Sequence, residues 1–222
     1  MSLILHIDTA LGEAGVCLGR EGRIVAMATQ SVQKDHAAWL QVAVEGLLGS
    51  VGHSLHDLRG IAISIGPGSY TGLRVGLSSA KGYCFALSIP LIAIDTLKII
   101  AHSVRHLTVG PICPMIDARR MEVYTAVYDQ QLHPLVHPHA LILTEEGVNN
   151  LAHPGKVSFC GNGAGKLRSL SNGEIHPILP EQPLLPSLTE LSWSHYQRGD
   201  YSSLAYTEPA YLKEFHGGKP TR

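Results

Sequence analysis

The stretch Ile61-Ala62-Ile63-Ser64-Ile65-Gly66-Pro67-Gly68-Ser69-Tyr70-Thr71-Gly72-Leu73-Arg74-Val75-Gly76 decides the fold. Its apolar, β-branched beginning ends abruptly at a glycine–proline turn, which predicts a strand followed by a loop. Apolar residues then recur at helical spacing and predict a helix of about four turns. These residues are Leu73, Leu77, Ala80, Cys84 and Leu87. The stretch is therefore expected to form a strand, a loop and a helix.

The loop in this stretch has two interpretations. Backbone amides at the start of a helix are unpaired and carry partial positive charge, so the loop could hold an anion while its glycines let a ligand approach closely. Alternatively, the loop is a tight structural connection. The glycines follow a G-x-G-x-x-x-G spacing, and no Gly-Lys-Ser/Thr follows them. This excludes the dinucleotide-binding fingerprint and the Walker loop.

The flanking sequence extends the pattern. Three closely joined strands are expected before the loop and predict an antiparallel meander; they cover residues 3–8, 15–18 and 23–29. A helix over residues 35–50 and a strand over 60–65 lead into the loop. After the second helix, residues 90–94 form a strand, and Asp95 caps a further helix that runs toward His106. This order matches the half-unit of actin-like and ribonuclease-H-like folds, although periodicity alone also allows other α/β layouts.

A second unit is expected to begin near Pro111. Its predicted elements are a hairpin of strands at 112–116 and 122–128, a short helix at 145–151, a strand at 156–160 and a helix at 188–199. A glycine turn at 161–165 ends the last of these strands, and a proline-rich connection at 177–186 precedes the helix. The glycine turn resembles the first loop in following a strand, and the two could face each other across a cleft. Alternatively, the second turn is only a structural connection.

Four motifs in order along the chain resemble the TsaB (YeaZ) family. They are Ile7-Asp8-Thr9, the Gly66–Gly76 segment, Ile116-Asp117-Ala118-Arg119 and Pro209-Ala210-Tyr211-Leu212-Lys213. The resemblance implies an α/β protein with the actin-like ATPase (ribonuclease-H-like) fold, in two lobes of which the second is shortened. We expect the N-terminal lobe to cover residues 1–107 and the C-terminal lobe residues 108–222.

The composition restricts the function. Of the 222 residues, 45% are hydrophobic and 16% charged, which indicates a globular protein, and the net charge of −1 argues against strong nucleic-acid binding by this chain alone. The four cysteines are isolated and lie beside apolar residues, as buried free thiols in a reducing cytosol would. We find no export signal and no membrane-spanning run, so a cytoplasmic protein is expected.

The two predicted helices on either side of the 60–65 strand carry more apolar surface than one sheet requires. Beyond the core stripe of each, apolar or small residues continue round the side, which suggests cover by another chain. The residues predicted to contact a partner are Trp39, Val42, Ala43, Gly46, Val75, Gly76 and Tyr83, with Gly49, Phe85 and Ala86 adding to the same character. The alternative is that neighbouring elements of the same chain cover both helices.

Residues for chemistry are sparse. Six positions are candidates for contact with a nucleotide or phosphate: Asp8, Thr9, Gly66, Gly68, Gly161 and Gly163. Equal alternatives are that Asp8 caps a turn and that Thr9 is an ordinary residue at the start of a loop. The resemblance places Thr96 and Ile100 where the catalytic paralogue, TsaD, has a metal-binding histidine pair, and neither is an ordinary metal ligand. We therefore expect no catalytic residue, no metal and no required cofactor, with room for weak ATP or ADP binding.

The resemblance implies a function in tRNA modification. The chain would be a non-catalytic scaffold of the bacterial complex that makes N6-threonylcarbamoyladenosine at position 37 of tRNA. Its expected partners are a TsaD-type catalytic subunit in a heterodimer, a TsaE-type ATPase subunit, a second copy of itself when alone, and tRNA only through the complex. The alternative is a free-standing actin-like-fold ATPase, phosphotransferase or peptidase.

Overall fold

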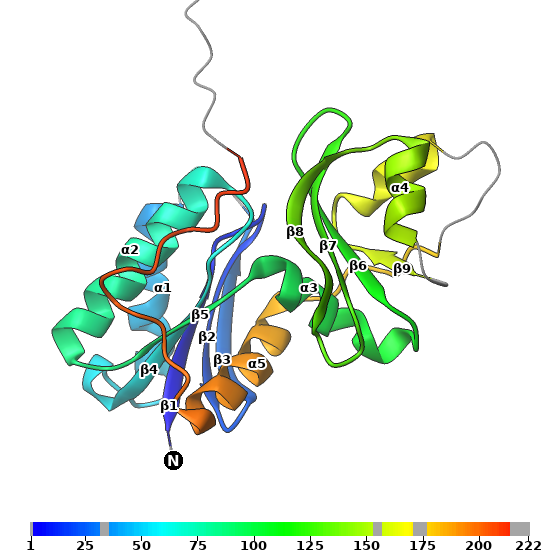
Figure 1. Cartoon of the computed structure of the whole chain (residues 1–222). Coiled ribbons are helices and arrows are strands. Elements are labelled where there is room, and N and C mark those ends of the chain that lie inside the picture. Colours follow the sequence, from blue (N-terminus) through cyan, green and yellow to red (C-terminus); the bar gives the residue numbers. More distant parts are fainter. Residues whose placement is uncertain (1, 32–35, 153–156, 171–176, 214–222) are drawn as a thin grey trace, which may run out of the picture.

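Two β-sheets and the helices between and around them build the molecule (Figure 1). The computed structural model describes residues 2–31, 36–152, 157–170 and 177–213. Within these residues the layers are a helix pair, the first sheet, a central pair of helices, the second sheet and an outer helix. No helix in the described ranges has both the length and the apolar character needed to span a membrane.

The first sheet confirms the predicted meander and its continuation. Its order is β3 (Arg23–Gln30), β2 (Ala14–Arg20), β1 (Leu3–Asp8), β4 (Leu58–Ser64) and β5 (Leu91–Ile94). The first three strands pair antiparallel, whereas β4 and β5 run parallel to β1. Strand β1 is buried along its whole length because helices cover both faces of the sheet.

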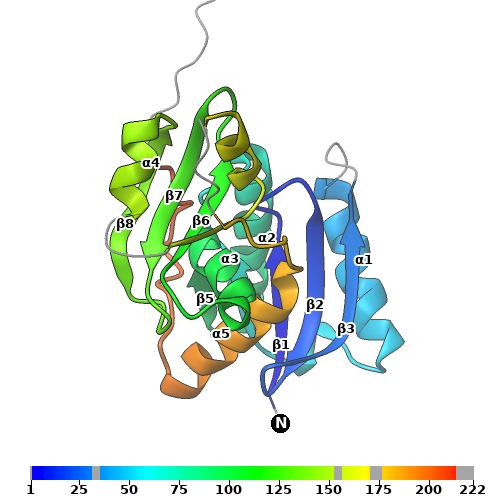
Figure 2. The same cartoon turned by 90° about the vertical axis from the view of Figure 1, so that its right-hand side faces the viewer.

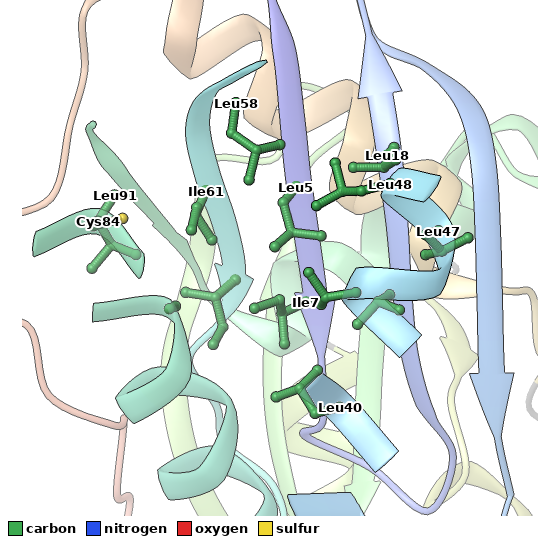
Figure 3. Packing of buried hydrophobic residues seen from close by; sticks show 14 of the residues in the cluster. Leu5, Ile7, Leu18, Leu40, Leu47, Leu48, Leu58, Ile61, Cys84 and Leu91 are labelled. Atoms are coloured by element: carbon green, nitrogen blue, oxygen red, sulfur yellow. The ribbon is translucent and has the colours of Figure 1, made fainter. Parts of the chain in front are cut away.

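Helices α1 (His36–Ser50) and α2 (Tyr70–Leu87) cover one face of this sheet, as predicted; the expected first residue of α1, Asp35, lies outside the described residues. Figure 3 shows Leu40 and Leu48 of α1 beside Ile7 and Leu5 of β1. Between the two helices the chain forms the short turn η2 (Leu55–Asp57), strand β4 and the loop after β4. The apolar stripes predicted from helical spacing are therefore the stripes that form the core.

Helices α3 (Thr96–Val104) and α5 (Leu184–Arg198) lie between the two sheets (Figure 2). Asp95 caps α3 as predicted, since its Oδ1 accepts a hydrogen bond of 3.0 Å from the amide of Lys98. Helix α5 begins four residues earlier than expected. Pro186 lies in its first turn, where a missing N–H leaves no helical hydrogen bond unmade. The proline-rich pattern of residues 177–186 instead predicts that this proline belongs to the connection.

The second sheet has the order β8 (Pro134–Ile142), β7 (Glu122–Tyr128), β6 (Ile112–Asp117) and β9 (Ser158–Cys160). Helix α4 (Glu145–Ala152) and the 3₁₀ turn η4 (Ala164–Ser169) cover one face, and α3 packs against the other. The predicted β6–β7 hairpin is confirmed. Most of β8 was missed because its prolines and histidines hide the alternation, and an edge strand tolerates proline. The first residue expected in β9, Lys156, lies outside the described residues.

From Leu184 onward the described chain packs on the first sheet. The expected C-terminal lobe of residues 108–222 therefore includes a segment that packs with the N-terminal lobe. Helix α5 packs on Ile4, Ile92 and their neighbours, and the following segment pairs with β5 through a 2.8 Å bond from the amide of Ser202 to the carbonyl of Leu91. The physical reason is that, among the described helices of residues 1–107, only α3 reaches this face of the sheet, through Ile99, and α5 covers the rest. In the sequence, the strands of the first sheet all precede residue 107 and those of the second sheet all follow it.

Buried hydrogen bonds join α5 to the first sheet. Nε2 of His6 lies 2.8 Å from Oγ of Ser192, and Sγ of Cys17 lies 3.4 Å from Oγ1 of Thr189. The four cysteines are free and buried, as expected. Burial lowers the pKa of His6 from 6.5 to about 4 and raises that of the Cys17 thiol to about 12.

His6 makes folding stability depend on pH. Because the folded protein binds a proton to His6 less readily than the unfolded chain, this contribution is complete above pH 6.5 and is lost as the pH falls toward 4. We expect the free energy of unfolding to fall by about 2 kcal/mol from this residue between pH 7.5 and 5. Urea denaturation at several pH values measures the slope. A His6→Gln variant with an unchanged slope would contradict the assignment.

Candidate functional site

The glycine loop between β4 and α2 is tied to distant parts of the chain. The amide of Gly66 donates to Oγ1 of Thr96 at 3.0 Å, and the amide of Thr96 donates to the carbonyl of Gly66 at 2.8 Å. On the other side, the amide of Ala210 donates to the carbonyl of Ile65 at 2.8 Å. Gly66 has φ of +109°, a conformation that favours glycine. The loop thus joins α3, the C-terminal segment and the first sheet.

The glycines after the loop are needed because α2 crosses the end of β1 at very short range. A Cβ atom on Gly68 would lie 2.2 Å from the carbonyl oxygen of Ala10, and one on Gly72 would lie 2.0 Å from that of Thr9. A Cβ on Gly76 would lie 2.3 Å from Oγ1 of Thr9. The close approach that these glycines permit is therefore to the protein's own backbone.

Asp8 and Thr9 are buried at the same crossing. The Asp8 carboxylate accepts hydrogen bonds from Oγ of Ser64 at 2.6 Å and from the amide of Ala10 at 3.1 Å, and burial raises its pKa. Thr9 has no exposed surface, and its hydroxyl donates to the carbonyl of Gly72 at 2.7 Å. Both side chains serve the turn after β1, and contact with a nucleotide stays a prediction.

The second glycine turn repeats this arrangement on the second sheet. Gly161 has φ of +86°, and a Cβ there would lie 2.5 Å from the carbonyl oxygen of Met115. The amide of Gly163 donates to the same carbonyl at 2.9 Å, and a Cβ on Gly163 would lie 2.9 Å from the carbonyl carbon of Ile116. The turn therefore packs on the carboxyl end of β6. Its contact with phosphate also stays a prediction.

In the described part of the chain no group of three or more His, Cys, Asp or Glu residues is arranged to hold a metal ion. Thr96 hydrogen-bonds to the glycine loop, as described above, and Ile100 is buried in the apolar cluster of α3 with Ile116 and Cys160. Thr96 is thus part of the anchor of the glycine loop, and Ile100 is part of the core.

The outward side of α1 is uncovered and carries apolar and small residues beside the exposed Gln41 and Glu45. Val42 is 70% exposed, and Gly46 and Gly49 are also exposed on the side of the helix opposite Leu40 and Val44. A Cβ on either glycine would meet no atom within 4 Å. This side therefore offers a surface on which a partner could approach the helix backbone closely.

The outward side of α2 has the same character. Phe85 is 80% exposed, Ala86 is exposed beside it, and Gly82 lies in open space one turn away. We call the combined surface of the two helices the outer helix face. It consists of Val42, Gly46, Gly49, Gly82, Phe85 and Ala86.

The predicted partner residues divide into three groups. Val42 and Gly46 lie on the outer helix face. Four others are half-buried and pack against the first core: Trp39, Ala43, Val75 and Tyr83. Gly76 was wrong as an interface residue because it faces Thr9 inside the molecule. Gly82 was missed, although a glycine in a helix interior is itself a signal of close packing or of an open face.

The helices α1 and α2 are joined to each other by polar side chains. The hydroxyl of Tyr83 donates to Oε1 of Gln41, and Nε2 of the same glutamine donates to Oγ of Ser79 at 3.2 Å. These bonds hold the two helices side by side.

A further cluster forms at the N-terminal end of α2. The guanidinium of Arg74 lies 4.1 Å from the ring centroid of Tyr70, and its Nε donates to the hydroxyl of Tyr211 at 3.0 Å. Next along the chain, Lys213 pairs with Glu122 on β7. The four motifs meet at one end of the molecule. The amide of Ser69 donates to the carbonyl of Ala10, next to Thr9, and Tyr211 contacts Arg74. Lys213 pairs with Glu122, whose carbonyl accepts a hydrogen bond from the amide of Ala118.

The sequence and structure are similar to those of known proteins. Residues 25–175 match the family model of TsaD, the tRNA N6-adenosine threonylcarbamoyltransferase. The chain is 33% identical over 222 residues to the tRNA threonylcarbamoyladenosine biosynthesis protein TsaB of Escherichia coli, covering 95% of this chain and 94% of that protein. It is 39% identical over 125 residues to TsaB of Bacillus subtilis, where the match spans 56% of this chain but only 54% of the relative.

Solved structures agree with the sequence comparison. YeaZ from Pseudomonas aeruginosa superimposes with a TM-score of 0.81 at 26% identity, covering 96% of this chain and 100% of that one. An activator of 2-hydroxyisocaproyl-CoA dehydratase from Clostridium difficile, solved with bound ADPNP, reaches a TM-score of 0.50 at 12% identity, covering 89% of this chain and 94% of that one. This second likeness concerns the fold alone, which is the two-lobed actin-like ATPase fold expected from the sequence.

Proposed function

Because the chain belongs to the TsaB (YeaZ) family of tRNA threonylcarbamoyladenosine biosynthesis proteins, we propose that it is a non-catalytic subunit that dimerises with a TsaD-type catalytic subunit. The observation that carries the proposal is the outer helix face, an exposed surface of apolar side chains and uncovered glycines. Surfaces of this kind on soluble proteins are commonly sites of protein association.

The outer helix face suits a homologous partner. Uncovered glycines let two helices approach closely, and a protein of the same fold would present a matching helix pair in the same layer. The match of this chain to the TsaD family model supports such a relationship between the two subunits. In the absence of that subunit, the same face would pair with its copy in a second molecule. The two pairings would then compete.

A scaffold role is supported by how the glycine loops are used. The loop amides, Asp8 and Thr9 bind or pack against other parts of the same chain. The complex would work in the cytoplasm, where the TsaD-type subunit transfers the threonylcarbamoyl group to tRNA and a TsaE-type ATPase binds to the complex. This chain would require no cofactor, and ATP or ADP would bind weakly.

Co-expression tests the proposal. We expect the chain and the TsaD-type subunit to elute together from a size-exclusion column at a mass of one copy of each, and the chain alone to elute as a homodimer. Adding the TsaD-type subunit should convert the homodimer to the heterodimer. Recovery of a monomer beside excess partner would contradict the proposal, and metal-dependent ATP turnover by the purified chain would favour the free-standing enzyme instead.

A further inference from the structure

Basic side chains gather at the end of the molecule where the motifs meet. We call Arg74, Arg119, Arg120, Lys166 and Lys213 the basic rim. Lys166 lies 2.5 Å from Oδ1 of Asp117, and Lys213 pairs with Glu122, so the two carboxylates of the rim are already neutralised. In Figure 1 the red end of the C-terminal segment and the loop above β6 and β7 lie at this upper end.

Arg119 and Arg120 form the exposed tip of the β6–β7 hairpin. Within the described residues neither guanidinium forms a hydrogen bond or an ion pair. Glu122 closes the turn by donating its amide to the carbonyl of Arg119 at 3.2 Å. Both have positive φ, +69° and +49°, where hairpins usually place asparagine or glycine. Such a conformation costs about 1 kcal/mol or more per residue, so an outlier of this kind suggests a function.

Exposed aromatic rings lie on the first-lobe side of the rim. Tyr70 is 39% exposed and Tyr211 43%, and their ring centroids are 5.2 Å apart with Arg74 against them. Tyrosine and arginine planes are the surfaces on which unstacked RNA bases pack. Acidic residues border the rim at the start of α4, Glu145 and Glu146, which follow the β8 end that pairs with Glu122.

We propose that the basic rim binds the phosphate backbone of the tRNA on which the complex acts. The inference rests on the proposed function, which supplies the RNA substrate. Guanidinium groups match phosphate oxygens in a planar, bidentate geometry. Asp117 lies close enough to interact electrostatically with Arg119, but its salt bridge is with Lys166, and Glu122 pairs with Lys213. With a net charge of −1 the chain has no overall attraction to RNA, so a local rim would act only when the catalytic subunit holds the tRNA nearby.

The test uses the heterodimer and an unmodified tRNA transcript, with binding followed by fluorescence anisotropy between 50 and 200 mM KCl. The variant is Arg119→Gly/Arg120→Gly, because glycine suits the left-handed backbone and keeps the hairpin folded. We expect affinity to fall about tenfold and the slope of log K against log salt to decrease by about one per lost phosphate contact. The control is Arg59→Gly/Arg198→Gly, two exposed arginines at the amino end of β4 and the last turn of α5.

Unchanged affinity and salt slope in the hairpin variant would overturn the proposal. Loss of TsaE-type subunit binding with RNA affinity intact would also overturn it and would assign the rim to a protein partner. Size-exclusion chromatography of the same samples reports subunit pairing separately. Failure of the subunits to pair would therefore count against the proposed function, whereas an RNA defect in a fully paired sample supports the basic rim.

Discussion

A Gly46→Arg variant is expected to lose the TsaD-type partner while remaining folded. A side chain at this position meets no atom within 4 Å in the isolated chain, so the arginine has room on the surface. Arginine is also a better helix former than glycine, by about 0.5–1 kcal/mol in a helix interior. In the complex, the same guanidinium would lie without a partner in an apolar interface.

The expected effect on pairing is large. Leaving a charge buried without a partner costs about 3 kcal/mol or more, which corresponds to a loss of at least about a hundredfold in affinity. Isothermal titration calorimetry with the TsaD-type subunit measures the change, and thermal unfolding of the variant alone checks that it is as stable as the parent. The homodimer should be lost in the same variant.

The matched control is Gln197→Arg, an exposed position on α5 at the opposite side of the first sheet. It adds the same side chain outside the outer helix face and should leave pairing intact. Equal affinity of Gly46→Arg and the parent would exclude this face as the interface. Ala43→Arg is less informative, because Ala43 packs partly against the first core and its replacement would mix a folding defect with a binding defect.

Local patterns in the sequence were sufficient to predict the elements near the glycine loop. The strand, the turn and the helix each carry their own signal within a few residues. Strand β4 lies within two residues of its predicted bounds, and α2 contains all the apolar residues from which a helix was predicted. The return of α5 to the first sheet was not predictable in this way. It depends on which sheet face lacks a cover, and that is known only when the whole topology is known.

In the candidate site, too, some residues could be predicted from local patterns, whereas others depend on contacts between distant parts of the chain. Helical spacing predicted Val42 and Gly46 as outward residues, but it could not separate Gly46 from Gly76, since both are glycines beside an apolar stripe. Gly76 is known to face inward only because α2 crosses the end of β1 there and places Gly76 against Thr9. The basic rim is likewise invisible in the sequence, because Arg74, Arg119 and Lys213 are far apart along the chain.

A Gly72→Ala variant is expected to lose most of the stability of the first lobe. Its backbone is in ordinary helical geometry, so alanine carries no conformational penalty, and the cost is steric. The new methyl group would lie 2.0 Å from the carbonyl oxygen of Thr9, at the buried end of β1. Thr9 cannot move away easily because its own hydroxyl is bonded to the carbonyl of Gly72 at 2.7 Å.

Either α2 or the end of β1 must therefore shift, and both are packed in the core, so we expect a loss of about 3 kcal/mol or more and a Tm lower by about 10 °C. Gly82→Ala on the same helix is the control, since its methyl group meets nothing within 4 Å and should raise stability by about 0.5–1 kcal/mol. Measuring both in the Gly46→Arg background keeps the chain monomeric, so that unfolding is not coupled to dimerisation. A Gly72→Ala protein as stable as its parent would mean that α2 does not cross β1 at this distance. The glycine loop would then be free for the anion contact that the start of α2 and the loop glycines also allow.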